Sequence, residues 1–272
     1  MPKVSIILPA YNAENTIDRC MESIENQTFQ DWELICCDDH SEDRTLNKLM
    51  EWQKKDSRIK VLSNQTNQKV AYTRNKCMQI AQGEYIAFID DDDYCAPDRL
   101  EKQVAFLDQN PEYSFVGCNG FLFDEKGVWG QMNCAEKPQK EDFLWGACFI
   151  NASLMVRAKD IREVGYFRVS KETRRTEDYD LFMRLYANGF YGYNLQEPLV
   201  YIYRGEKSYR KCKYRYRIDE AKIRYQNFKQ LGLLPGNFHY ILKPLIVGLL
   251  PTSYLENRQK RKYKKGVIDA KN

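Results

Sequence analysis

The sequence predicts an α/β fold in which a mostly parallel sheet is covered by helices on both faces. Short apolar runs alternate with longer amphipathic segments through the first hundred residues, and the short runs are apolar throughout rather than at every second position. The chain has 272 residues, 43% hydrophobic and 29% charged. This composition excludes a disordered or collagen-like protein, and the length suits one large domain with an appendage.

The first half of the chain reads as strands that alternate with helices. Strands are expected at residues 4–8, 33–37, 59–62 and 85–89, and helices at 16–26, 43–54 and 70–82. We expect Gly83 to end the third helix, because glycine commonly follows the last helical turn. Ligands of such sheets bind at the carboxyl ends of the strands, so functional residues are expected there.

The second half is less regular. After Pro97, which suits the first turn of a helix, we expect the following elements: a helix at 98–109, a strand at 113–123, loops and a hairpin at 127–149, a strand at 153–156, helices at 158–164 and 176–188 closed by Gly165 and Gly189, an extended segment at 191–203 and a basic helix at 208–231.

Charge is unevenly distributed along the chain. Residues 1–203 hold 24 basic and 33 acidic side chains, whereas residues 204–272 hold 18 and 5. This asymmetry predicts an acidic body that holds cations and a basic tail that binds phosphates or an anionic membrane surface. A nucleic-acid partner for the tail is the rival interpretation.

Two acidic clusters follow predicted strands. Asp38 and Asp39 come after the second strand, and Asp90 to Asp93 come after the fourth. Either cluster alone could be a solvated loop, but both should open onto one crevice. Consecutive carboxylates repel one another, and a bound Mg²⁺ or Mn²⁺ ion would relieve the repulsion. The two histidines of the chain, His40 and His239, are too few for a multi-histidine zinc site.

Several other site classes lack their motifs. The sequence contains neither the Gly-x-Gly-x-x-Gly motif nor the Gly-x-x-x-x-Gly-Lys-Ser/Thr motif of nucleotide-binding loops. It also lacks the Gly-x-Ser-x-Gly motif of hydrolases. Nine cysteines without a Cys-x-x-Cys pair favour reduced thiols and a cytoplasmic location. The N-terminus does not resemble a signal peptide, and the longest apolar stretch, residues 240–250, is too short to span a bilayer.

Six segments together resemble the successive signatures of family 2 inverting glycosyltransferases, which have the GT-A fold. They are residues 4–12 (VSIILPAYN), 27–43, 73–75, 83–100 (GEYIAFIDDDDYCAPDRL), 164–167 and 177–185 (EDYDLFMRL). The resemblance covers about residues 3–205. It implies a catalytic domain at 1–205, with a nucleotide-sugar half at about 1–110 and an acceptor half at 111–205, followed by a basic helical extension at 206–272.

The resemblance also implies roles for individual residues around a nucleotide-sugar donor. The nucleobase and ribose would lie against Pro9, Ala10, Tyr11 and Glu14. Asp39 would accept the ring N–H of the base, and Arg74 would lie near the base or the phosphates. Asp90 and Asp91 would face the ribose and sugar, Asp92 would bind the Mn²⁺ or Mg²⁺ ion, and Arg204 would approach the pyrophosphate. A surface position is the alternative for Arg204.

Asp178 resembles the general base that takes the proton of the acceptor hydroxyl. It lies at a predicted helix start, where the helix dipole should keep it ionised but poorly basic until a substrate desolvates it. Simple helix capping is the alternative. Glu177, Trp145 and Gly146 resemble the acceptor side of the site, although Trp145 would also suit a core.

The C-terminal region combines an apolar segment at 238–251 with a basic cluster at 258–265. This composition is typical of a monotopic anchor on an anionic leaflet, where each basic residue contributes about 1 kcal/mol. We therefore expect a peripheral protein on the inner face of the plasma membrane, where it would meet a lipid-linked acceptor. The alternative is a docking helix with a disordered tail.

The leading hypothesis is a metal-dependent inverting glycosyltransferase. It would move a sugar from a nucleoside diphosphate sugar, most often a UDP-sugar in the resembled family, to a hydroxyl of a growing, lipid-linked glycan of the bacterial cell surface. A nucleotidyltransferase-like enzyme would share the sheet and the acidic metal site, but it normally has a glycine-rich loop after its first strand. Two further hypotheses are a nucleic-acid-binding module that uses the basic tail and a catalytically inactive binding protein.

Overall fold

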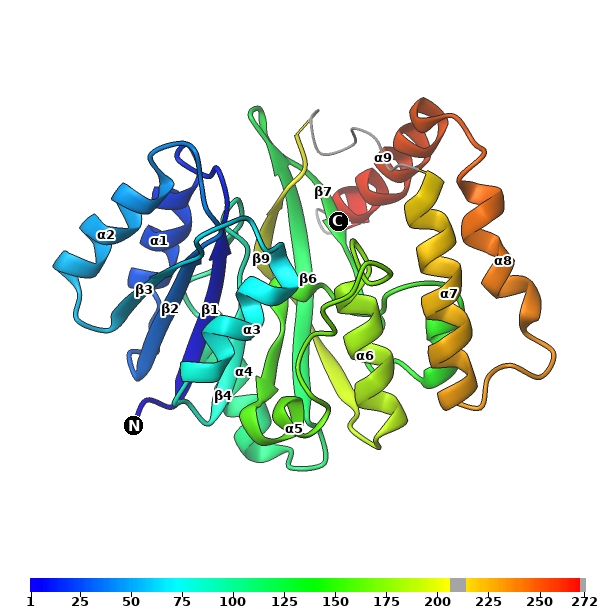
Figure 1. Ribbon diagram of the computed structural model, residues 1–272, viewed down its shortest axis with the longest axis horizontal. Coiled ribbons are helices and arrows are strands. Elements are labelled where there is room, and N and C mark those ends of the chain that lie inside the picture. The colour runs from blue at the N-terminus through cyan, green and yellow to red at the C-terminus, as the bar shows by residue number, and fades with distance from the viewer. Residues whose placement is uncertain (206–213, 270–272) are drawn as a thin grey trace.

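A single sheet forms the centre of the molecule in the computed structural model, which describes residues 1–205 and 214–269 (Figure 1). The described part of the sheet has nine strands in the order β3-β2-β1-β4-β8-β6-β9-β5, with β7 paired to β6. The strands are β1 (Val4–Ala10), β2 (Trp32–Asp38), β3 (Ile59–Ser63), β4 (Tyr85–Phe88), β5 (Tyr94–Cys95), β6 (Phe115–Asp124), β7 (Gly127–Met132), β8 (Met155–Arg157) and β9 (Gly192–Tyr203).

The first four strands are parallel, as predicted. β1 pairs with both β2 and β4, and β2 pairs with β3, all in parallel register. Both faces of this sheet are buried, because Ile6 packs into one hydrophobic core and its neighbour Ile7 packs into the other. Side chains alternate between the faces of a strand, so a strand covered on both sides is apolar at most positions.

Helices cover the two faces. Residues of α1, α2 and α4 belong to one core, and residues of α3, α5, α6, α7 and α8 belong to the other. The helices are α1 (Ile17–Glu25), α2 (Thr45–Lys55), α3 (Val70–Ile80), α4 (Arg99–Gln109), α5 (Ala158–Glu163), α6 (Glu177–Ala187), α7 (Tyr214–Gln230), α8 (Phe238–Val247) and α9 (Thr252–Asp269).

Strand directions are mixed in the C-terminal half. β6 runs parallel to β9 but antiparallel to β7 and β8, and β8 is also antiparallel to β4. Only the second strand of the observed hairpin, β7, lies within residues 127–149, where a hairpin was predicted, because its partner β6 ends at Asp124. The rest of that stretch contains a short 3₁₀-helix at Lys140–Leu144, which agrees with the irregular structure expected there.

The prediction that Gly83 ends the third helix was wrong. Helix α3 ends at Ile80, and Ala81 already has an extended backbone. A Cβ atom on Gly83 would lie 2.5 Å from the backbone nitrogen of Ser5. Glycine is therefore needed because the chain passes close to β1 and not because it ends a helix. Pro97 also lies just outside its helix, since α4 begins at Arg99.

The C-terminal helices pack against the domain at the end of the molecule opposite α2 (Figure 1). Ile223 and Phe228 of α7 are fully buried, and Asn227 Nδ2 donates a hydrogen bond to Asp180 Oδ1 of α6 at 2.9 Å. Helix α7 is thus part of the core. Residues 208–213, the predicted start of this helix, lie outside the described residues. No helix in the described ranges has both the length and the apolarity that a membrane span requires.

Candidate functional site

A cavity of about 360 Å³ opens where the loops after β1, β2 and β4 meet. We call it the carboxylate cavity. Its lining consists of Pro9, Ala10, Tyr11, Asp39, Val70, Thr73, Arg74, Asp90, Asp91, Asp92, Glu177 and Arg204. Apart from Val70 and Thr73, every one of these residues is a site residue predicted from the sequence. The carboxyl ends of parallel strands share one edge of the sheet, which explains why residues so distant in sequence meet there.

Asp39 orders the wall of the cavity after β2. One of its oxygens accepts hydrogen bonds from Asn64 Nδ2 at 2.8 Å and from the backbone N–H of Gln68 at 2.7 Å. The other oxygen accepts the backbone N–H of Lys69 at 2.8 Å. A carboxylate has about four acceptor positions, so Asp39 retains room for one further donor such as a nucleobase N–H.

The four consecutive aspartates point in different directions. Asp90 Oδ1 pairs with Arg74 at 2.5 Å, and Asp91 Oδ2 accepts the backbone N–H of Tyr11 at 2.8 Å. Asp90, Asp91 and Asp92 line the carboxylate cavity, whereas Asp93 is buried behind it. The cavity therefore receives the first three carboxylates of the run.

These carboxylates lie close together and are partly buried. Burial, joined by the charges of Asp92 and Asp90, raises the pKa of Asp91 to about 7. Burial and the charge of Asp90 raise the pKa of Asp92 to about 6, although Arg204 and Arg19 oppose the rise. Oxygen ligands with too little positive charge around them suit Mg²⁺ or Mn²⁺.

A complete protein cage for a metal is not seen in the described residues, where no three acidic, histidine or cysteine side chains converge closely enough. Mg²⁺ in phosphate-transfer and related sites is commonly held by one or two carboxylates together with substrate phosphates. Asp92, whose carboxylate lines the cavity, fits a site of that open kind.

Arg74 joins the two halves of the domain. Its side chain is only 4% exposed, and it pairs with Asp90 after β4 and, at 3.5 Å, with Glu177 at the start of α6. The next residue, Asn75, bonds both the backbone N–H and the carbonyl of Phe167. The motifs at residues 73–75, 83–100, 164–167 and 177–185 are therefore connected physically around one site.

Asp178 is the second residue of α6, beside Glu177. It is half-buried, and its Oδ1 accepts the backbone N–H of Tyr179 at 2.7 Å. Burial raises the pKa of Asp178, while the Tyr179 N–H and the charge of Arg74 act against the rise. The expectation of a poorly basic carboxylate is thus corrected, because burial outweighs the helix start even before a substrate binds.

Three further predicted site residues lie outside the carboxylate cavity. Glu14 accepts the backbone N–H of Arg44 at 3.1 Å and so joins the loops after β1 and β2. Trp145 is 67% exposed and contacts Tyr240 of α8, with ring centroids 5.0 Å apart. It is therefore not a core residue. Gly146 follows it with a φ of 155°, and a Cβ atom added there would meet no other atom within 4 Å.

The sequence reasoning missed Arg19. Its guanidinium donates to the backbone carbonyl of Asp92 at 2.8 Å and lies 4.6 Å from the ring centroid of Phe123. Nothing in the sequence marks Arg19, because one arginine on an amphipathic helix is normally a solvated position.

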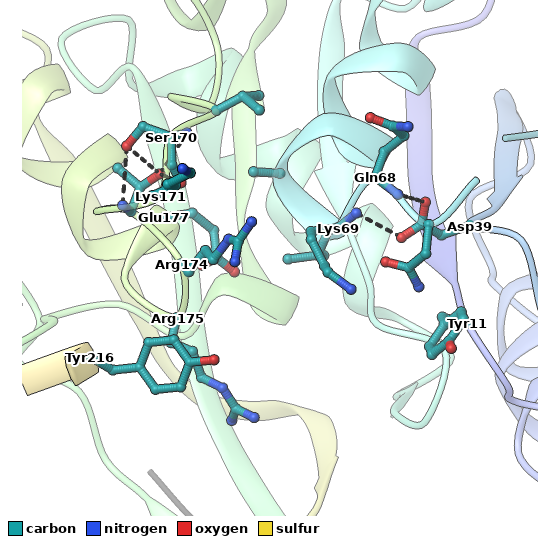
Figure 2. Close-up of a pocket in the computed structure, with 15 residues that line it drawn as sticks. Tyr11, Asp39, Gln68, Lys69, Ser170, Lys171, Arg174, Arg175, Glu177 and Tyr216 are labelled. Atoms are coloured by element: carbon teal, nitrogen blue, oxygen red, sulfur yellow. Dashed lines mark hydrogen bonds between the residues drawn. The ribbon is translucent and has the colours of Figure 1, made fainter. Parts of the chain in front are cut away.

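A second, larger cavity of about 820 Å³ adjoins the first. Lys69 lies on one wall, and the loop before α6 contributes Lys171, Arg174 and Arg175 on the other wall (Figure 2). We call it the cationic cavity. Four residues, Tyr11, Asp39, Val70 and Glu177, line both cavities. The basic residues before α6 were visible in the sequence, but they were overlooked beside the acidic motif that follows.

Comparison with known proteins gives one consistent family. Residues 5–165 match the sequence model of glycosyl transferase family 2. The chain is 39% identical over 262 residues to EpsE of Bacillus subtilis (strain 168), named as a glycosyltransferase, covering 96% of this chain and 94% of that protein. It is also 39% identical over 134 residues to WfgD of Escherichia coli, a UDP-Glc:α-D-GlcNAc-diphosphoundecaprenol β-1,3-glucosyltransferase, with 49% and 52% of the two chains covered.

Solved structures share the fold. S. aureus TarS 1–349, in complex with UDP-GlcNAc, superposes with a TM-score of 0.72 at 21% identity, over 89% of this chain and 73% of that one. The mannosyltransferase PcManGT of Pyrobaculum calidifontis, in complex with GDP-Man and Mn²⁺, gives a TM-score of 0.61 at 17% identity, over 98% and 82%. Similarity at these identities supports the GT-A architecture of the sheet and its helices.

Proposed function

Because this chain belongs to glycosyl transferase family 2, we propose that it moves a sugar from a nucleoside diphosphate sugar to a hydroxyl of a growing glycan with inversion at the anomeric carbon. One observation carries the proposal: the carboxylate cavity brings Tyr11, Asp39, Asp92 and Arg204 together with Glu177, the neighbour of Asp178. The site thus has a nucleobase wall, oxygen ligands, a cation for the phosphates and an adjacent base.

The donor lies in the carboxylate cavity. Its base rests on Tyr11 and donates to the remaining acceptor position of Asp39, and Arg204 neutralises part of the diphosphate charge. A Mg²⁺ or Mn²⁺ ion held by Asp92 would supply electrostatic stabilisation of the leaving diphosphate. The donor is a UDP-sugar, by analogy with the UDP-Glc that WfgD uses and the UDP-GlcNAc bound to TarS.

The acceptor reacts on the side of Asp178. Its hydroxyl oxygen attacks the anomeric carbon while the bond from that carbon to the diphosphate breaks, and Asp178 takes the hydroxyl proton. The products are the extended glycan with inverted configuration and the nucleoside diphosphate. The raised pKa of Asp178 favours this role, because a carboxylate with a higher pKa is a stronger proton acceptor.

The acceptor is carried on a lipid, and the C-terminal helices bring the enzyme to an anionic membrane such as the inner face of the plasma membrane. Four strongly exposed apolar side chains follow one another at helical spacing along and just after α8: Phe238, Leu242, Ile246 and Leu249. Basic groups lie close by. Burial lowers the pKa of Lys243 in α8, and the positive charges of Arg258 and Lys262 lower it further. Apolar and cationic groups side by side are typical of interfacial helices.

Isothermal titration tests the donor site. UDP, GDP and dTDP are titrated into the purified protein, each with Mn²⁺ and with EDTA, and the series is repeated with Asp92→Ala. We expect metal-dependent binding of UDP that is lost in the variant, and an unchanged result for Asp31→Ala, which removes an exposed carboxylate elsewhere. If none of the three nucleotides binds under either condition, the proposed function is wrong.

A further inference from the structure

The cationic cavity carries most of its positive charge on the wall that the loop before α6 forms. Its lining includes four cationic side chains, Lys69, Lys171, Arg174 and Arg175, against two carboxylates. Those carboxylates are Asp39, whose oxygens accept three N–H groups, and Glu177, which pairs with Arg74. Both negative charges are therefore already engaged by other groups.

The cations themselves lack carboxylate partners in the described part of the chain. Within residues 1–205 and 214–269, no ion pair joins Lys69, Lys171, Arg174 or Arg175 to an acidic side chain, and Arg175 instead lies over the ring of Tyr216 at 5.9 Å. Figure 2 shows Lys69 on one side of the cavity and the three other cations on the opposite side. Positive groups that converge on a cavity in this way favour an anionic ligand.

The loop that carries these cations is ordered by its own hydrogen bonds. Thr173 is buried at the centre of the loop, where its hydroxyl donates to the carbonyl of Arg168 at 2.8 Å and accepts the backbone N–H of Ser170 at 3.2 Å. The backbone N–H of Thr173 in turn donates to the hydroxyl of Ser170. This arrangement holds Lys171 and Arg174 at the cavity wall.

The position of the cavity indicates which substrate meets these cations. Lys171, Arg174 and Arg175 line the cationic cavity but not the carboxylate cavity, where Asp90, Asp91, Asp92 and Arg204 receive the donor. Glu177 borders both cavities, and Asp178 follows it. An acceptor bound in the cationic cavity would therefore lie next to Glu177, the neighbour of the proposed base Asp178.

We propose that the cationic cavity, through Lys171 and Arg174, binds an anionic group on the acceptor. This inference rests on the proposed function, in which Asp178 activates the acceptor. The anion is either a phosphate ester that links the acceptor sugar to a carrier or the carboxylate of an acidic sugar. Both are oxyanions, which the guanidinium of Arg174 can bind through two parallel N–H donors and which the ammonium of Lys171 attracts as a point charge.

Ligand-detected NMR titrations test the proposal. The protein is saturated with UDP and Mn²⁺, and three probes are added separately: N-acetylglucosamine 1-phosphate, glucuronic acid and neutral methyl glucoside. We expect at least one anionic probe to bind and methyl glucoside not to bind. The K171E/R174E variant should weaken anion binding by at least about tenfold, because each lost cation removes a charge-assisted contact.

The matched control is K54E/K159E, which reverses two exposed charges on α2 and α5. It should leave the affinity for every probe unchanged. Binding of the phosphate probe alone would identify a phosphate-linked acceptor, and binding of glucuronic acid would identify an acidic sugar. Equal affinity for all three probes, or an anion affinity that K171E/R174E does not change, would overturn the proposal.

Two measurements separate this inference from the proposed function. UDP affinity and the unfolding transition of K171E/R174E should match those of the native protein, since neither residue lines the carboxylate cavity. The probe titrations are also made without UDP. If none of UDP, GDP and dTDP binds the native protein, the proposed function is wrong, while anion binding by Lys171 and Arg174 is still measured directly.

Discussion

The carboxylate of Asp93 accepts the backbone N–H of Tyr203 at 2.8 Å and so fixes the end of β9 against the acidic run. The next residue is Arg204, which lines the carboxylate cavity and lowers the pKa of Asp92. Asp93 itself is buried outside the cavity. The fourth carboxylate of the run therefore positions a cation for the other three.

We predict that Asp93→Ala will destabilise the protein and weaken UDP binding, because it leaves the Tyr203 N–H without a partner and frees Arg204 to move. The unpaired N–H should cost about 1–3 kcal/mol of unfolding free energy. Asp93→Asn should be milder in both respects, since its amide oxygen can accept the same hydrogen bond. Urea unfolding and UDP titration measure the two effects. Equal behaviour of the alanine variant and the native protein would show that the Asp93 contact has no such role.

Asp178→Asn should abolish most sugar transfer while leaving UDP affinity unchanged. A positioned general base contributes about 10²- to 10⁴-fold to a rate, and the amide cannot accept the proton. Because a carboxylate works as a base only when ionised, transfer by the native enzyme should fall as the pH drops through the raised pKa of Asp178. Asp31→Asn makes the same chemical change at an exposed position and should keep the native rate and pH profile. A native rate in Asp178→Asn would remove Asp178 as the base.

The parallel half of the sheet could be predicted from the sequence because its signal is local. Every residue of β1 and β2 is buried, and runs that are apolar except for Ser5, Glu33 and Asp38 indicate that burial directly. Gly83 carried a misleading signal. It follows a helix, but the reason for the glycine is the nearby backbone of Ser5, 78 residues away in sequence. Contacts across such a separation leave no local pattern.

The candidate site was likewise predictable from the sequence only in part. The carboxylates after β2 and β4 were found because the sheet topology places strand ends together. The location of Trp145 depended on the packing of α8, whose Lys243 donates to the Trp145 carbonyl at 2.9 Å. Residue type did not distinguish an acceptor-side aromatic from one that lies beside the C-terminal helices. Arg19 was missed for a related reason, since its partner is a backbone carbonyl rather than a motif residue.

Glu33 should make stability depend on pH. It is 5% exposed in β2 and accepts hydrogen bonds from Ser5 at 2.6 Å, from the backbone of Gln82 at 2.8 Å and from Lys60 at 2.8 Å. Burial alone would raise its pKa, but these three donors outweigh burial and hold the pKa below the usual 4.5. The folded state thus prefers the ionised form.

We expect Glu33→Gln to lower the unfolding free energy by about 1–2 kcal/mol at pH 7, because a charged acceptor is lost. A depressed pKa stabilises the fold above the unfolded pKa of about 4.3, and the benefit disappears as the pH falls through the lower folded value. The gap between variant and native protein should therefore be constant from pH 8 to 5 and narrow below it. Chemical denaturation across this range tests the prediction, with the exposed Glu51→Gln as control. A gap that widens in acid would contradict it.

Exposed apolar residues of the C-terminal helices should determine membrane binding. Ile246 and Leu249 are 64% and 74% exposed, and no described element covers them as the core covers Ile241. Replacing both with glutamate removes two large apolar groups and adds negative charge, so binding to phosphatidylglycerol-containing vesicles should fall at least about tenfold in sedimentation.

The control M50E/I80E makes the same kind of change at exposed positions of α2 and α3 and should bind as the native protein does. Native binding should also weaken with salt and with vesicles of phosphatidylcholine alone, because basic groups contribute to it. If the native protein ignores phosphatidylglycerol vesicles, or if both double variants bind equally well, α8 is not the membrane contact and the lipid-linked acceptor must be met in another way.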